Sequence, residues 1–315
     1  MIDEIFEDWD ATHTRGYGRE LVRINHRLHQ SPLFTDAAIE RLIETYPREH
    51  YDLHTMVPGE HRRESWREGD IGTRTGKEVM EAIRHGQIWL NLRKVMKVSA
   101  PYGDLLNRMF AEIEDHVPGL HTYKHNFGML ISSPKAQVFF HADIPGQSLW
   151  QIRGVKRVYV YPNEAPFLPQ EGLEAIVLNE ADESDLPYHT WYDDESTVID
   201  LQPGEMLHWP LNAPHRVVNL DTLNVSITTE HYTTDIRNTY VVNYANGILR
   251  RRFGFENLSR RTSGPAFLAK MALAAAYKYS GIQKQKRFAR HIDFAIDPAS
   301  PLGFRDISPR LRSEY

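Results

Sequence analysis

Two histidines and one aspartate in this 315-residue chain have the types and spacing of metal ligands. Only Ala142 separates His141 from Asp143, and His215 lies much farther along the chain. In a β-strand alternate side chains point the same way, so His141 and Asp143 can reach one metal ion while Ala142 faces away. Two histidines and a carboxylate on one face of an iron ion leave the opposite positions open for a co-substrate and oxygen. The triad therefore predicts a redox-active iron site, although a lone His-x-Asp also occurs by chance on solvated loops.

The sequence around these residues favours a buried site. Residues 138–140, Val-Phe-Phe, predict a buried strand that leads into the first two ligands. Lys156 alternates with Val158 on a second predicted strand, so its side chain is expected to point into the same apolar interior. A lysine on a buried face is unusual unless it meets an anion. Residues 203–204, Pro-Gly, predict a turn that begins a strand just before the loop bearing His215.

Together these motifs resemble the JmjC and cupin-like Fe(II)/2-oxoglutarate-dependent oxygenases, in particular the branch containing the factor-inhibiting-HIF asparaginyl hydroxylase. The matching motifs are His-x-Asp at 141–143, Gln-Ile-Arg-Gly-Val-Lys-Arg at 151–157, Pro-Gly-x-x-x-x-x-Pro-x-x-x-x-His at 203–215, and a final core strand over 217–228. The resemblance covers roughly residues 85–235. It is specific for fold, metal and co-substrate and nearly silent on the substrate.

The resemblance implies a role for each matching residue. Fe(II) would be held by His141, Asp143 and His215, with 2-oxoglutarate and O2 as co-substrates. Lys156 would bind the distal carboxylate of 2-oxoglutarate. Gln147 stands where the family often places a polar residue that faces the substrate.

Two positions depart from the family's pattern in the co-substrate pocket. Trp89 stands where the family supplies a tyrosine to the distal carboxylate, and Val138 stands where a hydroxyl-bearing residue is expected. Asn91, Ser226 or Thr228 could supply the missing hydrogen bonds.

Short strands dominate from about residue 122 to residue 232, which suits a double-stranded β-helix, the jelly roll of cupins. The expected fold class is therefore mainly β with helical extensions. We expect a mainly helical N-terminal extension over 1–84, the catalytic jelly roll over 85–235, and a basic, mainly helical C-terminal extension over 236–315. Amphipathic patterns predict helices at 37–46, 76–84 and 104–114.

Composition fits a globular enzyme. Hydrophobic residues make up 41% and charged residues 25% of the chain, and there is no cysteine. The absence of cysteine excludes disulfides and thiolate metal sites and leaves histidine and carboxylate as ligands. The N-terminus shows no signal-peptide pattern, and the most apolar stretch, 266–277, is too short to span a bilayer. We expect a cytoplasmic protein.

Charge is unevenly distributed along the chain. Residues 250–315 hold 14 Lys and Arg against 5 Asp and Glu, whereas the whole chain has a net charge of −5. This basic segment could pack on the acidic body, on a second subunit through C-terminal helices, or on an acidic partner. No basic motif with interleaved aromatic residues supports nucleic-acid binding.

An acidic insert separates the first two ligands from the third. Residues 180–195 contain seven acids, interleaved with Tyr188, Trp191 and Tyr192. The insert is either a solvated loop or a substrate-facing rim. In the second case its charge would favour a basic or amide-bearing substrate, with Trp191 and Tyr192 contacting it.

The remaining histidines lack ligand spacing. His208 lies in a predicted core strand and is interpreted as a hydrogen-bonded structural residue. His121, His125 and His231 flank strands, and His189 lies in the acidic insert. None of them is expected to bind the catalytic metal.

The predicted function is hydroxylation of a peptide or protein side chain, coupled to decarboxylation of 2-oxoglutarate to succinate. Hydroxylation next to nitrogen would give a demethylation instead. Alternatives are a 2-oxoglutarate-dependent hydroxylase of a small metabolite and a metal-binding cupin-type protein that does not use 2-oxoglutarate. A non-catalytic binding protein is disfavoured by the complete triad, and Lys156 disfavours a cupin without the co-substrate.

Overall fold

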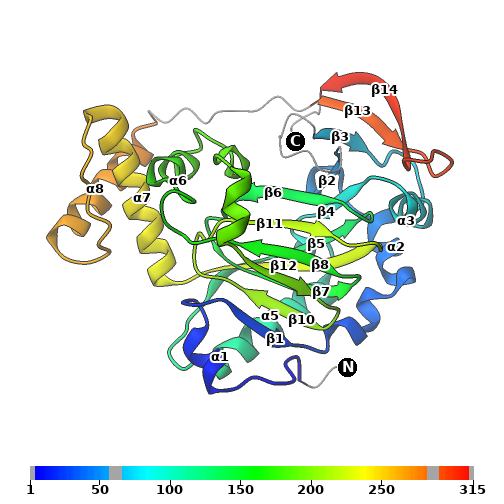
Figure 1. Cartoon of the computed structure of the whole chain (residues 1–315), viewed down its shortest axis with the longest axis horizontal. Coiled ribbons are helices and arrows are strands. Elements are labelled where there is room, and N and C mark those ends of the chain that lie inside the picture. Colours follow the sequence, from blue (N-terminus) through cyan, green and yellow to red (C-terminus); the bar gives the residue numbers. More distant parts are fainter. Residues whose placement is uncertain (1–3, 57–65, 282–290, 312–315) are drawn as a thin grey trace.

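Two facing β-sheets form the centre of the computed structural model, which describes residues 4–56, 66–281 and 291–311 (Figure 1). The large sheet has the order β1 (Val22–Asn25), β10 (Glu205–His208), β7 (Gly146–Arg153), β12 (Asn224–Tyr232), β5 (Tyr123–Ser132), β4 (Trp89–Leu92), β2 (Tyr51–Thr55), β3 (Arg67–Asp70), β13 (His291–Ile296) and β14 (Phe304–Leu311). The small sheet has the order β6 (Gln137–His141), β11 (His215–Asn219), β8 (Lys156–Val160) and β9 (Thr197–Leu201). Strands distant in sequence are neighbours in both sheets, as in a jelly roll. The predicted fold class is confirmed.

Apolar side chains from both sheets fill the space between them. Leu130 and Leu149 from the large sheet pack with Val158, Leu201 and Val217 from the small sheet. Successive side chains of a strand point to opposite faces of its sheet. Polar residues an even number of positions from these apolar residues therefore also point into this interior, toward its ends. The ligand-bearing strands β6 and β11 are antiparallel, and His141 and His215 are paired residues in their register.

Helices cover the outer faces of the sheets. They are α1 (Ala11–Gly16), α2 (Asp36–Glu44), α3 (Gly76–His85), α4 (Val95–Val98), α5 (Ala100–His116), α6 (Gln170–Val177), α7 (Thr234–Phe253) and α8 (Pro265–Tyr279). The apolar faces of α2, α3 and α5 pack in one large core cluster with side chains of the large sheet. Helices α6, α7 and α8 contribute to a second cluster around Phe140 and Tyr161. None of the helices in the described residues is long and apolar enough to cross a membrane.

The helix predictions agree with the structure, with small differences at the ends. Thr35 caps α2 by accepting a hydrogen bond from the Ala38 backbone N–H, and Thr75 forms a capping box with Glu78 at the start of α3. Side-chain acceptors of this kind satisfy N–H groups that have no partner within the helix. The predicted helix at 104–114 is the inner part of α5.

Both ends of the chain contain more strand than the sequence predicts. The N-terminal segment 1–84 supplies β1, β2 and β3, and the C-terminal segment supplies β13 and β14. Most of these strands are only four to six residues long, and their propensity signal is weak because pairing with distant strands stabilises them. Strand β13 pairs in parallel with β3, so the last hairpin extends the large sheet (Figure 1).

The described part of the basic C-terminal segment pairs with acids of the body. Arg250 and Arg251 make ion pairs with Glu174 and Glu180, and Arg310 pairs with Asp70. Three of the excess positive charges are thereby balanced within the chain. Dimerisation through the C-terminal helices stays a prediction.

Candidate metal centre

The three predicted ligands converge at one end of the space between the sheets. His141 is the last residue of β6, Asp143 follows two residues later, and His215 is the first residue of β11. Each residue offers one ligand atom, and these three atoms all lie within 4.8 Å of one another. The pairing of β6 with β11 brings the two histidines together although 73 intervening residues separate them in the sequence.

Backbone hydrogen bonds fix which ring nitrogen each histidine presents. Nδ1 of His141 lies 2.7 Å from the Phe139 carbonyl oxygen, and Nδ1 of His215 lies 3.1 Å from the Ala213 carbonyl oxygen. A carbonyl oxygen only accepts, so Nδ1 carries the proton and Nε2 keeps its lone pair. The Nε2 atoms lie 4.0 Å and 3.4 Å from the Asp143 carboxylate oxygens. This tautomer is the one that metal-binding histidines use when Nδ1–H is held by an outer partner.

The electrostatics of the triad favour a divalent cation. Asp143 is 9% exposed, and burial, with a further contribution from Glu230, raises its pKa. Burial and the neighbouring His141 ring hold the pKa of His215 well below its usual value, so this imidazole is neutral. Among the described residues, no lysine or arginine makes an ion pair with Asp143. Two nitrogen donors and an uncompensated buried carboxylate therefore fit a metal ion, whose charge would stabilise the ionised carboxylate.

Gln147 and Asn212 hold the aspartate in place. The Gln147 carboxamide, with its nitrogen toward Asp143, donates to Oδ1 at 2.8 Å and also to Oδ2. The Asn212 side chain donates to the Asp143 backbone carbonyl at 2.6 Å. Gln147, predicted to face the substrate, thus contacts a metal ligand while it also lines the cavity.

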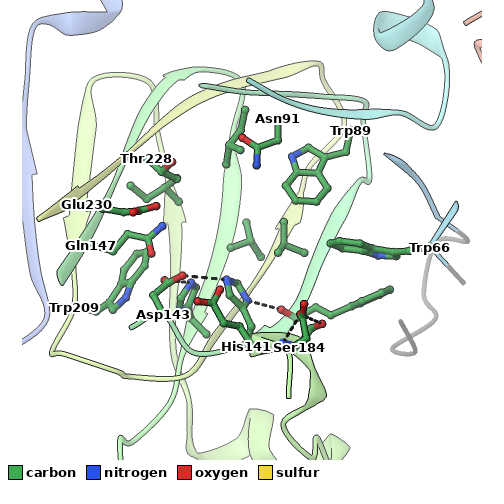
Figure 2. Close-up of a pocket in the computed structure, with 18 residues that line it drawn as sticks. Trp66, Trp89, Asn91, His141, Asp143, Gln147, Ser184, Trp209, Thr228 and Glu230 are labelled. Carbon is green, nitrogen blue, oxygen red and sulfur yellow. Dashed lines mark hydrogen bonds and ion pairs between the residues drawn. The ribbon is translucent and has the colours of Figure 1, made fainter. Parts of the chain in front are cut away.

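A cavity of about 280 Å³ opens beside the triad. Figure 2 shows His141 and Asp143 at one end and Asn91 and Trp89 at the opposite end. Its aromatic walls are Trp66, Trp89, Phe139 and Trp209. The Trp209 ring lies 4.3 Å from the His215 ring between centroids, so it shields one side of that ligand. Aromatic walls exclude water and strengthen electrostatic interactions inside the cavity.

The predicted co-substrate residues divide into two groups. Asn91, Thr228 and Val138 line the cavity, as does Trp89 in the position where a tyrosine is expected. Ser226 does not line it, because its hydroxyl donates to Gln151 Oε1 at 2.7 Å in the polar layer beneath.

Lys156 also lies beneath the cavity rather than on its wall. Its side chain is 3% exposed, and Nζ donates to Asn219 Oδ1 at 3.0 Å. In the register of β8 with β11, Lys156 pairs with Asn219 two residues beyond the pair Val158–Val217, and Val217 lines the cavity. Lys156 therefore points inward, as predicted, but one layer deeper than the cavity floor. Burial lowers the pKa of Lys156 to about 7, and no described acidic side chain pairs with it.

The acidic insert contributes to the cavity through its first part only. Asp182, Glu183 and Ser184, at the short 3-10 helix η5 (Glu183–Asp185), line the cavity. The predicted substrate contacts Trp191 and Tyr192 do not line it. They belong to η6 (Thr190–Glu195), where Tyr192 is 2% exposed and packs against Phe167, while Trp191 is 49% exposed.

Asp193 explains why η6 is held away from the cavity. Its carboxylate accepts hydrogen bonds from the Tyr161 and Tyr188 hydroxyls and from the guanidinium of Arg216. Arg216 directly follows His215 in β11, so this ion pair fastens the insert to a ligand-bearing strand. Asp193 is therefore a structural anchor and not a free charge for capturing substrate.

Glu230, Glu183 and Trp66 are among the cavity residues that the sequence did not predict. Glu230 follows Thr228 by two positions in β12, so strand alternation alone aims both side chains at the cavity. Glu183 carried no signal that distinguished it from the other acids of the insert. Trp66 belongs to a segment without a clear pattern, and it reaches the cavity through ring contacts with Trp89 and Phe139.

Comparisons with known proteins agree with this fold. YcfD from Escherichia coli, solved by X-ray diffraction, has 15% sequence identity and a TM-score of 0.50, and the match covers 89% of this chain and 70% of that chain. A second structure, described as YcfD, a ribosomal oxygenase, in complex with cobalt and 2-oxoglutarate, has 15% identity, a TM-score of 0.48 and coverage of 89% and 68%. The chain matches no protein-family model and no curated protein. At this identity the first likeness is one of fold.

Proposed function

We propose that this protein is an Fe(II)/2-oxoglutarate-dependent oxygenase that hydroxylates a side chain of a peptide or protein. The observation that carries the proposal is the convergence of His141, Asp143 and His215 with both Nε2 atoms directed toward the carboxylate. Iron held by these residues would, together with 2-oxoglutarate, supply the oxidising power for C–H hydroxylation by O2, with release of succinate and carbon dioxide. The description of the fold neighbour YcfD as a ribosomal oxygenase, with cobalt and 2-oxoglutarate bound, agrees with this proposal.

Residues of the chain would position the reactants. Gln147 and the backbone carbonyls that bind Nδ1 hold the three ligands in a fixed arrangement. Asn91 and Thr228 offer hydrogen bonds on the cavity wall, and Lys156 is a buried amine, with its pKa lowered to about 7, that lacks an acidic partner among the described residues. The distal carboxylate of 2-oxoglutarate would supply that negative charge, and a charge-assisted hydrogen bond would result.

The cavity wall favours a cationic substrate side chain. Asp182, Glu183 and Glu230 line it, and burial raises the pKa of both glutamates. A cation entering between these acids would restore their ionised forms, and the rings of Trp66 and Trp89 offer faces for cation–π contact. We therefore propose that the substrate presents a basic residue at this entrance.

The cavity acids allow a direct test of the substrate class. The double variant Glu183→Gln/Glu230→Gln is expected to raise KM for a basic peptide about tenfold, with only a modest dependence on salt, because partly buried charges are screened less than exposed ones. Decarboxylation of 2-oxoglutarate without substrate is expected to change much less than KM for the peptide, because neither glutamate is one of the three converging ligands. KM would be measured by mass spectrometry of the peptide product at two ionic strengths.

The matched control is Asp194→Asn/Glu195→Gln, which removes the same charge at two acids of the insert that lie outside the cavity. Asp193 is left intact because it anchors the insert. Equal KM values for the cavity variant, the control and the parent at both salt concentrations would contradict a cationic substrate. A small uncharged metabolite would then be the better candidate.

A second candidate function is a metal-dependent cupin-type activity without 2-oxoglutarate. It is favoured by Trp89 in place of the tyrosine and by the contact of Lys156 with Asn219 below the cavity floor. Formation of succinate from 2-oxoglutarate by the protein with Fe(II) under air separates the two candidates. Fe(II)-dependent succinate supports the oxygenase, and its absence at saturating 2-oxoglutarate contradicts it.

A further inference from the structure

A second cavity, of about 410 Å³, adjoins the metal cavity. The two cavities have five lining residues in common, which are Trp66, Trp89, Asn91, Asp182 and Ser184. Figure 2 shows Trp66 and Trp89 on the side of the metal cavity opposite Glu230. The second cavity therefore continues the metal cavity on its tryptophan side.

The outer strands of the large sheet supply most of the second cavity's lining. In the order of that sheet, β2, β3 and β13 follow β4 on the side away from β5 and β12. Trp89 of β4 pairs with His54 of β2, which pairs with Glu68 of β3. Paired residues lie on the same face of a sheet, so these three side chains form a row across the strands. His291 and Asp293 of β13 lie at the far end of the cavity.

The length of this row suits an extended polypeptide. Neighbouring strands lie about 4.8 Å apart, so the three spacings from β4 to β13 span about 14 Å. An extended chain rises about 3.3 Å per residue, and about four residues would therefore cross the row. A small metabolite held in the metal cavity would leave the second cavity unused, whereas a polypeptide can occupy both.

Aromatic rings, more than net charge, characterise the second cavity. The His54 ring contacts the rings of Trp66 and Trp89, with centroids 5.0 Å and 5.5 Å apart. Three carboxylates of the lining are in ion pairs with arginine side chains, namely Asp52 with Arg93, Glu68 with Arg48 and Asp293 with Arg67. Because these charges are compensated within the chain, the aromatic row offers the main contact surface to an occupant.

We propose that the second cavity binds the substrate segment that flanks the reacting residue on one side. The reacting residue enters the metal cavity, and about four further residues continue in extended conformation past Trp89 and Trp66 toward β13. An apolar or aromatic side chain of this segment packs against the row formed by Trp89, His54 and Trp66. This inference rests on the proposed oxygenase function, and it adds to that function a minimum substrate length and a second determinant of specificity.

The test uses the full chain with Fe(II) and 2-oxoglutarate and three synthetic peptide libraries built around one fixed arginine. The core library has two randomised residues on each side of the arginine. The other two libraries add four randomised residues, one at the N-terminal end and one at the C-terminal end. Product that has gained one oxygen atom is measured by mass spectrometry. One extended library is expected to react at least tenfold faster than the core, with apolar or aromatic residues enriched in its added segment, and the other to stay within twofold of the core.

Two variants locate the effect in the second cavity. His54→Ala removes the ring that contacts both tryptophans and is expected to lower the rate with the favoured library about fivefold, with little effect on the core library. His291→Ala changes an exposed residue at the far end, so the fold is expected to persist, and the favoured library is expected to react about twofold more slowly. The control His189→Ala, at an exposed histidine outside both cavities, is expected to leave all three rates unchanged.

Several results would overturn the proposal. Equal rates for the three libraries, or an equal gain from both extensions, would show that no one-sided segment is bound. A full gain retained in both His54→Ala and His291→Ala would place the segment elsewhere on the protein. If no library is hydroxylated although the protein forms succinate from 2-oxoglutarate, the second cavity has no such role, while the proposed oxygenase stands. Absence of succinate would overturn the proposed function together with this inference.

Discussion

His215→Ala is expected to abolish high-affinity metal binding and turnover while the jelly roll stays folded. His215 supplies one of the three converging ligand atoms, and its ring is 2% exposed against Trp209. Loss of an outer partner of a metal ligand costs about 10- to 100-fold in metal affinity, so the loss of a ligand is expected to exceed 100-fold. Anaerobic calorimetric titration with Fe(II) or Co(II) would measure it, with circular dichroism to confirm the fold.

His189→Ala is the matched control, because His189 is an exposed histidine of the insert that lies outside the cavity. It is expected to leave metal affinity within twofold of the parent. Full metal affinity and activity in His215→Ala would show that the triad assignment is wrong.

Lys156→Met is expected to stabilise the fold while it weakens the use of 2-oxoglutarate. Burial lowers the folded-state pKa of Lys156 from 10.5 to about 7. Below pH 7 the lysine is protonated in both the folded and the unfolded states, so the cost of burying its charge is fully present. Between pH 7 and 10.5 only the unfolded state holds the proton, and the stability of the parent rises with pH. Each pKa unit corresponds to about 1.4 kcal/mol, so methionine is expected to add a few kcal/mol at pH 6, and this advantage shrinks toward pH 10.

Urea unfolding of parent and variant at pH 6 and pH 9 would measure this difference, provided that two-state behaviour holds at both values. The same substitution is expected to raise the apparent KM for 2-oxoglutarate by a factor equivalent to about 2–3 kcal/mol of binding free energy, the scale of a hydrogen bond to a charged group. Unchanged dependence on 2-oxoglutarate would exclude Lys156 from the co-substrate site, whatever its effect on stability.

The ligand set and the jelly roll could be predicted because both follow from local rules. Strand alternation aims His141 and Asp143 the same way, and the apolar runs around them mark buried strands. The same rule predicts the inward direction of Lys156, but it does not give the depth of a side chain within a barrel. That depth depends on the register of β8 with β11, which a single sequence does not specify.

The remaining features depend on contacts between distant segments. The ion pair of Asp193 with Arg216 sets the direction of the acidic insert. Charge and aromatic content alone therefore pointed to Trp191 and Tyr192, whereas the first part of the insert, residues 182–184, lines the cavity. The interpretation of His208 as a hydrogen-bonded core residue agrees with its contact to Ser148 Oγ at 3.0 Å. Its position between the rings of Tyr17 and His231 becomes visible only in the fold.

Anaerobic titration of the protein with Fe(II) and 2-oxoglutarate tests the central claim most directly. Chelation of the metal by the keto acid gives a visible metal-to-ligand charge-transfer band. The account predicts that this band develops to one equivalent of Fe(II) in the parent and in His189→Ala, and that it is absent in His215→Ala. It also predicts that Lys156→Met requires much more 2-oxoglutarate to reach the same intensity. Binding of Fe(II) without any such band at saturating 2-oxoglutarate would contradict the proposed oxygenase and favour a cupin-type metal protein that does not use this co-substrate.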